Sequence, residues 1–97
     1  MSELIKNSQW VYVLIHGPEG KEQLLGQQDE EMNVSFIPVF LEKEHALMNL
    51  NLLAHEKGCK YETQAMLYED LIDRISGQEF MLFVLNESGE VIERIEL

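Results

Sequence analysis

The sequence WVYVLI at residues 10–15 decides the fold of this chain, and FMLFVL at residues 80–85 repeats its character near the other end. Both runs are continuously apolar and rich in β-branched or aromatic residues, which is typical of strands that are buried on both faces. We therefore expect Trp10–Ile15 and Phe80–Leu85 to be interior strands at the centre of one β-sheet.

Between these runs, three further segments have the pattern of strands. Val34–Leu41 is apolar, and Pro38 inside it indicates an edge position or a bulge, because proline cannot donate to a ladder. Cys59–Leu67 alternates as a half-buried strand does. Gln23–Gln27 suits a short edge strand, and the polar segment Gln28–Asn33 suits a turn or loop.

Two segments show a helical period instead. Glu42–Lys57 is predicted to be a helix, and its core stripe consists of Ala46, Leu47, Leu50, Leu53 and Ala54. Tyr68–Ser76 is predicted to be a second, shorter helix that ends at Gly77. Near the end of the chain, Asn86–Glu90 is predicted to be a hairpin turn, and Val91–Leu97 a charged closing strand that protects a sheet edge.

The expected order of elements is β, β, α, β, α, β, β, with an additional short edge strand after the first strand if Gln23–Gln27 forms one. This order predicts an α/β (α+β) fold with a single mixed sheet of about five strands and two helices. The length of 97 residues corresponds to one domain spanning 1–97, in which residues 1–8 are expected to be a flexible N-terminus.

Three local motifs follow each other in a familiar order. Pro38-Val39-Phe40 leads from a strand into a helix, Tyr68-Glu69-Asp70-Leu71 opens the second helix, and Phe83-Val84-Leu85-Asn86 ends a strand before a hairpin. This order resembles the N-terminal domain of SseB-like proteins, although Leu41 stands where that family usually has Ser or Thr, and Glu87 where it tends to have Pro. A cyanobacterial domain family of unknown function has a similar order. The resemblance implies a small α/β domain of the bacterial cytoplasm, and it supplies no catalytic residues.

The charge and the single cysteine limit the function further. With 18 acidic and 7 basic residues the net charge is −11, which repels phosphate backbones and anionic membrane surfaces. We therefore expect no nucleic-acid or membrane partner; the acidity serves solubility, or alternatively makes the domain an acidic decoy of a basic partner. Because Cys59 is alone and no apolar run is long enough for a signal or a membrane helix, we predict a cytoplasmic location.

No group of residues has the spacing of a catalytic site, a metal site or a cofactor-binding site. Gly17–Lys21 lacks the spacing and the hydroxyl residue of a phosphate loop. His45 and His55 would lie about 15 Å apart on one helix, too far to share an ion. Cys59 has no base placed by the sequence to activate it. We therefore predict a protein that is not an enzyme and has no cofactor.

The first predicted helix has apolar residues on the side that should face solvent. Met48 and Leu52 are neighbours on the side opposite the core stripe, and His45 and His55 flank them. They predict either an interface or a patch covered by a loop such as Gln28–Asn33. The first reading makes the domain an interaction or regulatory module, acting through a protein partner or as a homodimer. The alternative reading is a small-molecule sensor with a pocket near the His16–Gly20 turn.

Overall fold

A computed structural model describes residues 5–16, 23–50 and 61–96 and has an α+β fold. Its elements are β1 (Trp10–His16), β2 (Gln23–Leu24), β3 (Gln27–Asp29), β4 (Val34–Val39), α1 (Lys43–Asn49), β5 (Tyr61–Leu67), α2 (Tyr68–Ile75), β6 (Phe80–Leu85) and β7 (Val91–Ile95). The predicted class and order are confirmed, except that the strand expected at Gln23–Gln27 is divided into β2 and β3. Residues 51–60, which include the predicted end of the first helix and Cys59, lie outside the described residues.

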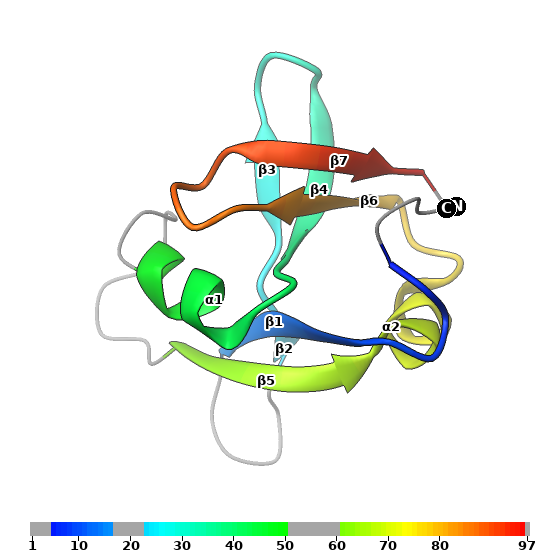
Figure 1. Cartoon of the computed structure of the whole chain (residues 1–97). Coiled ribbons are helices and arrows are strands. Elements are labelled where there is room, and N and C mark those ends of the chain that lie inside the picture. The colour runs from blue at the N-terminus through cyan, green and yellow to red at the C-terminus, as the bar shows by residue number, and fades with distance from the viewer. Residues whose placement is uncertain (1–4, 17–22, 51–60, 97) are drawn as a thin grey trace.

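The strands form two sheets, whereas the sequence predicted one. The first sheet has the order β2-β1-β5, and the second has the order β3-β4-β6-β7. Within the described chain β4 and β6 run parallel, and the other paired strands are antiparallel. β1 and β6 are each interior, as predicted, but they belong to different sheets, and that part of the prediction is wrong. β6 and β7 lie above β1 and β5 in Figure 1, with α1 and α2 at opposite ends of the molecule.

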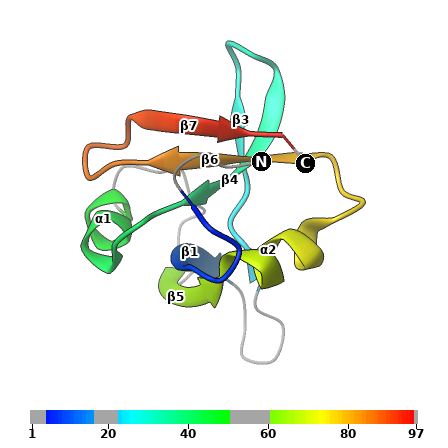
Figure 2. The ribbon, with the colours of Figure 1, turned by 45° about the vertical axis from the view of Figure 1, so that its right-hand side comes forward.

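The sheets separate because the chain changes from one to the other at two corners. At the first corner, Leu25 and Gly26 divide β2, which pairs with β1, from β3, which pairs with β4. A Cβ at Gly26 would lie 3.1 Å from the ring of Phe80, closer than ordinary van der Waals contact. At the second corner, Phe40 follows β4 and pairs with Tyr12 of β1 through backbone hydrogen bonds of 2.8 and 2.9 Å. Corners of this kind let strands cross between packed sheets, and Figure 2 shows the two layers from the side.

Pro38 lies in the part of β4 that has lost one neighbour. The pairing of β3 with β4 ends at Phe36, whereas the pairing of β4 with β6 continues to Val39. On the β3 side Pro38 is therefore at an open edge, where its missing N–H costs no ladder hydrogen bond. The edge position predicted for Pro38 is confirmed on that side, although β4 as a whole is an interior strand.

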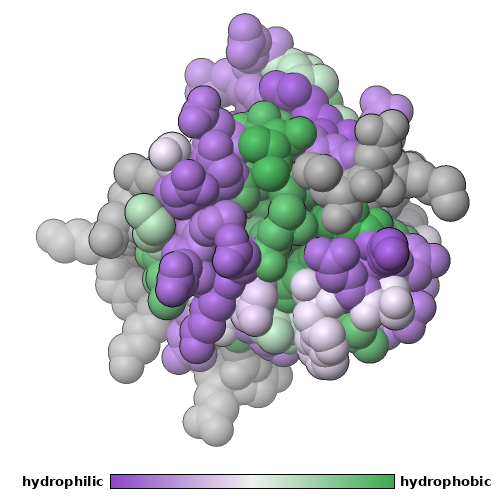
Figure 3. All heavy atoms as spheres, viewed as in Figure 1, coloured by the Kyte–Doolittle hydropathy of each residue, from purple (hydrophilic) through white to green (hydrophobic). Residues whose placement is uncertain are grey.

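Apart from Trp10, which is 57% exposed at the start of β1, the strands β1 and β6 are mostly buried on both faces, and their alternate residues enter two hydrophobic clusters. The larger cluster, which includes side chains of α2, consists of Ile5, Val11, Val13, Ile15, Ile37, Val39, Tyr68, Leu71, Ile75, Leu82, Val84 and Ile95. The smaller cluster, which includes a side chain of α1, consists of Leu14, Leu25, Phe40, Ala46, Phe83 and Leu85. Because Ile5 is packed into the core, the N-terminal segment differs there from the flexible stretch expected over residues 1–8. Figure 3 shows apolar residues reaching the surface between α1 and α2 with hydrophilic residues on both sides.

Tyr68 gives the larger cluster a buried hydroxyl. The residue is 2% exposed, and no described residue offers its hydroxyl a hydrogen-bond partner. Burial raises the pKa of Tyr68 above its ordinary value, and the negative charge of Glu93 raises it further. The folded protein therefore holds this proton more tightly than the unfolded chain does. Tyr68 therefore adds no pH dependence below the unfolded pKa of about 10, and the free energy of unfolding falls as the pH rises from that value to the folded one.

Tyr68→Phe is expected to leave the free energy of unfolding unchanged or to raise it by up to ~1 kcal/mol at neutral pH, because it removes a desolvated hydroxyl that lacks a partner. The variant should also lose less stability than the wild type when the pH rises above about 10. Urea unfolding on both sides of that pH measures both effects, and Tyr12→Phe, at a half-buried tyrosine, serves as the control. A loss of more than ~1 kcal/mol at neutral pH would show that the hydroxyl has a stabilising partner.

Candidate functional site

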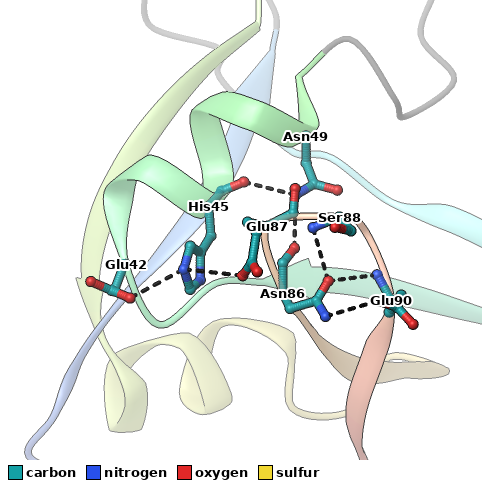
Figure 4. A network of polar contacts seen from close by, with 7 residues as sticks. All are labelled: Glu42, His45, Asn49, Asn86, Glu87, Ser88 and Glu90. Atoms are coloured by element: carbon teal, nitrogen blue, oxygen red, sulfur yellow. Dashed lines mark hydrogen bonds and ion pairs between the residues drawn. The ribbon is translucent and has the colours of Figure 1, made fainter.

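Helix α1 is held against the hairpin between β6 and β7 by the buried side chain of Asn49. Asn49 is 0% exposed, and it is the buried polar residue of the described core. Its Nδ2 donates hydrogen bonds to the backbone carbonyls of His45 at 2.8 Å, Asn86 at 2.9 Å and Glu87 at 3.4 Å (Figure 4). A buried amide that serves carbonyls on two elements fixes their relative position, because separating them would leave polar groups unpaired away from water.

The hairpin that receives α1 is shaped by Asn86. The side-chain oxygen of Asn86 accepts hydrogen bonds from the backbone N–H groups of Ser88 and Glu90, each at 2.9 Å. The backbone N–H of Asn86 donates to the carbonyl of Glu90 at 3.0 Å, and Gly89 adopts the left-handed φ of 82° that favours glycine. The predicted turn Asn86–Glu90 is therefore confirmed, and an asparagine side chain organises it.

His45 lies at the junction of α1 and the hairpin. Its Nε2 is 3.1 Å from Oε2 of Glu42 at the start of the helix and 3.5 Å from Oε2 of Glu87 in the hairpin. Figure 4 shows the imidazole between the two carboxylates. When His45 is protonated, both contacts become ion pairs that link the helix to the hairpin. His45 thus contributes to positioning α1, together with Asn49.

The side of α1 that is turned to solvent is called the outer face here. It consists of Lys43, Glu44, Leu47 and Met48, which are all exposed. Met48 is 57% exposed, so of the two predicted alternatives the cover by the described segment 28–33 does not apply to it. The other predicted members of the apolar patch, Leu52 and His55, lie outside the described residues.

Leu47 belongs to the outer face, and its prediction as a core residue is wrong. It is 47% exposed, whereas Ala46 and Asn49 are fully buried and Leu50 is partly buried. These three inward residues follow the i, i+3, i+4 spacing of one helical face. Because the hydrogen bonds of Asn49 hold that face against the hairpin, Leu47 is turned outward beside Met48.

A pocket of about 410 Å³ lies on another part of the molecule, between β2, β4, α2 and the start of β6. Its apolar lining consists of Leu24, Ile37, Ile75 and Phe80. Its polar lining consists of Gln23, Arg74 and Gln78, which are all exposed. Gln23 pairs with His16 across β1 and β2. Residues 17–20 of the turn where the sequence placed a sensor pocket lie outside the described residues, so that alternative stays a prediction.

The remaining candidates from the sequence do not converge on a site in the described chain. Gly17–Lys21 and Cys59 lie outside the described residues. His16 packs against Tyr61, with ring centroids 5.4 Å apart. Searched over the described residues, the structure holds no group of three or more His, Cys, Asp or Glu side chains suited to a metal ion. In the same part of the chain, every helix is too short or too polar to cross a membrane.

No family model, no curated protein and no solved structure matches this chain. The resemblance to SseB-like N-terminal domains therefore stays a prediction. The candidate functional surfaces are therefore identified from geometry alone. They are the outer face of α1, with the hairpin that holds the helix, and the pocket.

Sequence reasoning missed Asn49, the residue that sets which side of α1 faces outward. A signal for it was present, because Asn49 lies on the same helical side as Ala46 and Leu50, and a polar residue on an apolar stripe often has a buried hydrogen-bonding role. The polar lining of the pocket carried no such signal. Gln23, Arg74 and Gln78 are ordinary surface residues in the sequence, and only the fold brings them to the lining of one pocket.

Proposed function

We propose that this domain is a protein-interaction or regulatory module, and that the outer face of α1 binds a second copy of the chain. The observation that carries the proposal is the exposure of two adjacent large apolar side chains, Leu47 at 47% and Met48 at 57%. Methionine adapts its shape readily at contact surfaces. A rigid helix that presents two such side chains favours docking, and the anchoring by Asn49 supplies the rigidity.

The charge of the outer face supports a second copy as the occupant. Lys43 and Glu44 cancel, so the face is formally neutral in a chain whose net charge is −11. Two copies of such an acidic chain repel each other over most of their surfaces. A neutral apolar face is where they can approach at least electrostatic cost. Around a two-fold axis the same face serves both partners.

The size of the patch sets the strength expected for this dimer. Burying a fully exposed Leu or Met side chain contributes about 1.5–3 kcal/mol, and these two are about half exposed. Four such side chains in a two-fold dimer contribute roughly 3–6 kcal/mol of gross transfer energy. Association costs at least several kcal/mol, so neighbouring contacts must add to this gain. We therefore expect a weak dimer with a dissociation constant of about 0.1–1 mM.

The proposal assigns binding and no catalytic step to this domain. In the part of the chain that the structure describes, the contacts of His45 with Glu42 and Glu87 join two structural elements. Nδ2 of Asn49 and the side-chain oxygen of Asn86 make the hydrogen bonds that shape the helix–hairpin junction. These groups position the outer face.

The double change Leu47→Glu with Met48→Glu is expected to weaken self-association by at least about tenfold, because it places like charges across the two-fold axis. Sedimentation equilibrium of both proteins up to about 1 mM measures the change. The matched control is Met32→Glu with Ile92→Glu, which adds the same charge at apolar positions that are 44% and 46% exposed and lie outside α1. Circular dichroism checks that each protein stays folded.

Salt provides a second arm of this experiment. Dimerisation of the wild type should tighten between ~0.05 M and ~0.5 M salt, because screening weakens the repulsion between two acidic chains and leaves the apolar contact intact. A wild type that stays monomeric at about 1 mM in high salt contradicts the proposal. Equal weakening by the control variant would assign the effect to net charge and also contradict it.

A further inference from the structure

The four edge strands of the described fold differ in how they are protected from pairing with another chain. β2 and β3 have only two and three residues. β7 carries Glu93 and Arg94 and pairs with β6 through an irregular register. β5 has seven residues in unbroken register with β1, and it contains no proline, lysine or arginine. Since short length, charge and irregularity are the usual protection of an edge, β5 is the edge that lacks it among the described strands.

The backbone of β5 turns hydrogen-bonding groups toward this edge. Tyr12 bonds to Phe40 through both its N–H and its carbonyl, on the side of β1 away from β5. Ala65 lies opposite Tyr12 in the antiparallel pairing, so its N–H and carbonyl point away from β1. Thr63 points the same way, because the carbonyl of its partner Leu14 is bonded on the β2 side. No described residue pairs with Thr63 or Ala65 along this edge.

Apolar side chains lie beside these open backbone groups. Residues that are opposite each other in an antiparallel pair share a face of the sheet, and Trp10 is opposite Leu67 as Tyr12 is opposite Ala65. Trp10 is 57% exposed, Ala65 is exposed, and the other two are half-buried. Figure 1 shows β5 along the lower margin of its sheet, where it runs directly into α2. An added strand would gain main-chain hydrogen bonds together with an apolar surface for its side chains.

The charge around β5 indicates which kind of strand would be added. Glu62 is the charged residue of β5, and Glu69 and Asp70 are exposed in the first turn of α2. Against these acids stands Lys6, in the segment that bonds to the start of α2 through Asn7. The whole chain has a net charge of −11. A second copy would bring the same negative charge to this edge, whereas a segment with lysine or arginine is attracted to it.

We propose that the edge of β5 over Thr63–Leu67 binds an extended basic segment of a partner protein as an added strand. Alternate apolar side chains of that segment pack beside Trp10 and Ala65, and its basic side chains lie near Glu69 and Asp70. This edge does not include the outer face of α1, so the proposal does not depend on self-association.

The test is an NMR titration of the isotope-labelled full chain with a blocked peptide of sequence Lys-Lys-Thr-Val-Thr-Val-Thr-Lys-Lys. The chain is kept at about 0.05 mM, below the dissociation constant expected for the dimer. The expected result is saturable binding, with a dissociation constant below about 1 mM, that shifts the backbone amide signals of Thr63, Ala65 and Leu67.

A matched peptide carries methyl groups on the backbone nitrogens of its two valines. In an antiparallel strand added to β5, the residues that face Trp10 are also those whose N–H groups point to β5. The methylated peptide should therefore bind at least about tenfold more weakly, because it lacks the donors of the new ladder. Equal binding of the two peptides overturns the proposal, and this comparison needs no protein variant to fold.

The charge of the partner is tested on both molecules. Glu69→Gln with Asp70→Asn should weaken binding of the lysine peptide by about threefold or more. The matched control is Glu30→Gln with Glu31→Gln, which removes the same charge from the turn between β3 and β4, on the opposite side of the molecule from β5 in Figures 1 and 2. Equal weakening by both pairs overturns the proposal, as does equal binding of a peptide with glutamate in place of lysine.

Hydrogen exchange of the free chain tests the open edge without a ligand. The amides of Thr63 and Ala65 should exchange at least about tenfold faster than those of Gln64 and Met66, which point to β1. Slow exchange at Thr63 and Ala65 would assign the edge to another part of the chain or, if protection grows with concentration, to a second copy. Either result overturns the proposal, and so does the absence of saturable peptide shifts along Thr63–Leu67.

Discussion

Replacing Phe40 by alanine is expected to lower the free energy of unfolding by about 3–5 kcal/mol, a large share of the stability of a small domain. Phe40 is 0% exposed and belongs to the smaller cluster with Leu14 and Phe83. Its backbone also forms the two hydrogen bonds that join β4 to β1 through Tyr12. Removing the ring leaves a cavity at the corner where the two sheets meet, and the rigid strands on both sides cannot collapse to fill it.

Urea unfolding measured by circular dichroism gives this difference directly. Phe36→Ala is the matched control, because it removes the same atoms from a ring that stacks on Phe83 at 4.3 Å but is only half-buried. We expect the loss for Phe36→Ala to be about half the loss for Phe40→Ala, in proportion to the apolar area that each ring buries. A loss for Phe40→Ala no larger than that of Phe36→Ala would contradict the two-sheet corner.

The second large effect is expected at Asn49. Asn49→Ala should cost about 1–3 kcal/mol, because it removes the part-buried hydrogen bonds of Nδ2 to the carbonyls of Asn86 and Glu87 and leaves a space in the core. Asn49→Leu should cost a similar amount, because an apolar side chain of similar size restores packing but not the hydrogen bonds. The measurement is again urea unfolding at neutral pH.

The matched control for Asn49 is Asn7→Ala, since Asn7 is exposed and its change should stay within about 0.5 kcal/mol. A cost below about 1 kcal/mol for Asn49→Ala would show that the hydrogen bonds do not hold α1 in place. The positioning role has a second readout. If Asn49 fixes the outer face, a folded Asn49 variant should also self-associate less strongly than the wild type, although Leu47 and Met48 are unchanged.

The strands that are buried on both faces could be predicted from the sequence. The continuous apolar runs at 10–15 and 80–85 identified β1 and β6, and the alternation of their residues between two clusters explains why no polar residue interrupts either run. The hairpin at Asn86–Glu90 was also predictable, because its asparagine and glycine are the residues that such a turn requires.

The division into two sheets could not be predicted in the same way. It depends on the corner at Leu25 and Gly26 and on the pairing of Phe40 with Tyr12, which join segments far apart in the sequence. Hydrophobic periodicity reports which face of a strand is buried, and it carries no information about which strand lies beside it.

The orientation of α1 was predicted in part. The exposure of Met48 followed from the apolar stripe, but Leu47 was assigned to the wrong side, because one polar side chain outweighed the hydrophobic pattern. When the side of α1 that carries Asn49 faces inward, Asn49 makes hydrogen bonds to the hairpin. The apolar side chain of Leu47 could not make these hydrogen bonds. The pocket beside α2 was not predicted, because its lining residues come from segments that lie far apart in the sequence.

The most direct test of the proposed function is whether the outer face of α1 contacts a second copy. A mixed sample, in which half of the chains carry isotope-labelled methionine methyl groups and the other half are unlabelled, reports contacts between copies by filtered NMR. The Met48 signal is identified by its loss in Met48→Leu. The proposal predicts intermolecular cross-peaks from the Met48 methyl to protons of α1 in the other copy, at a concentration of about 1 mM in high salt. A concentrated sample without such cross-peaks, or with cross-peaks that come from another methionine such as Met32, would contradict it.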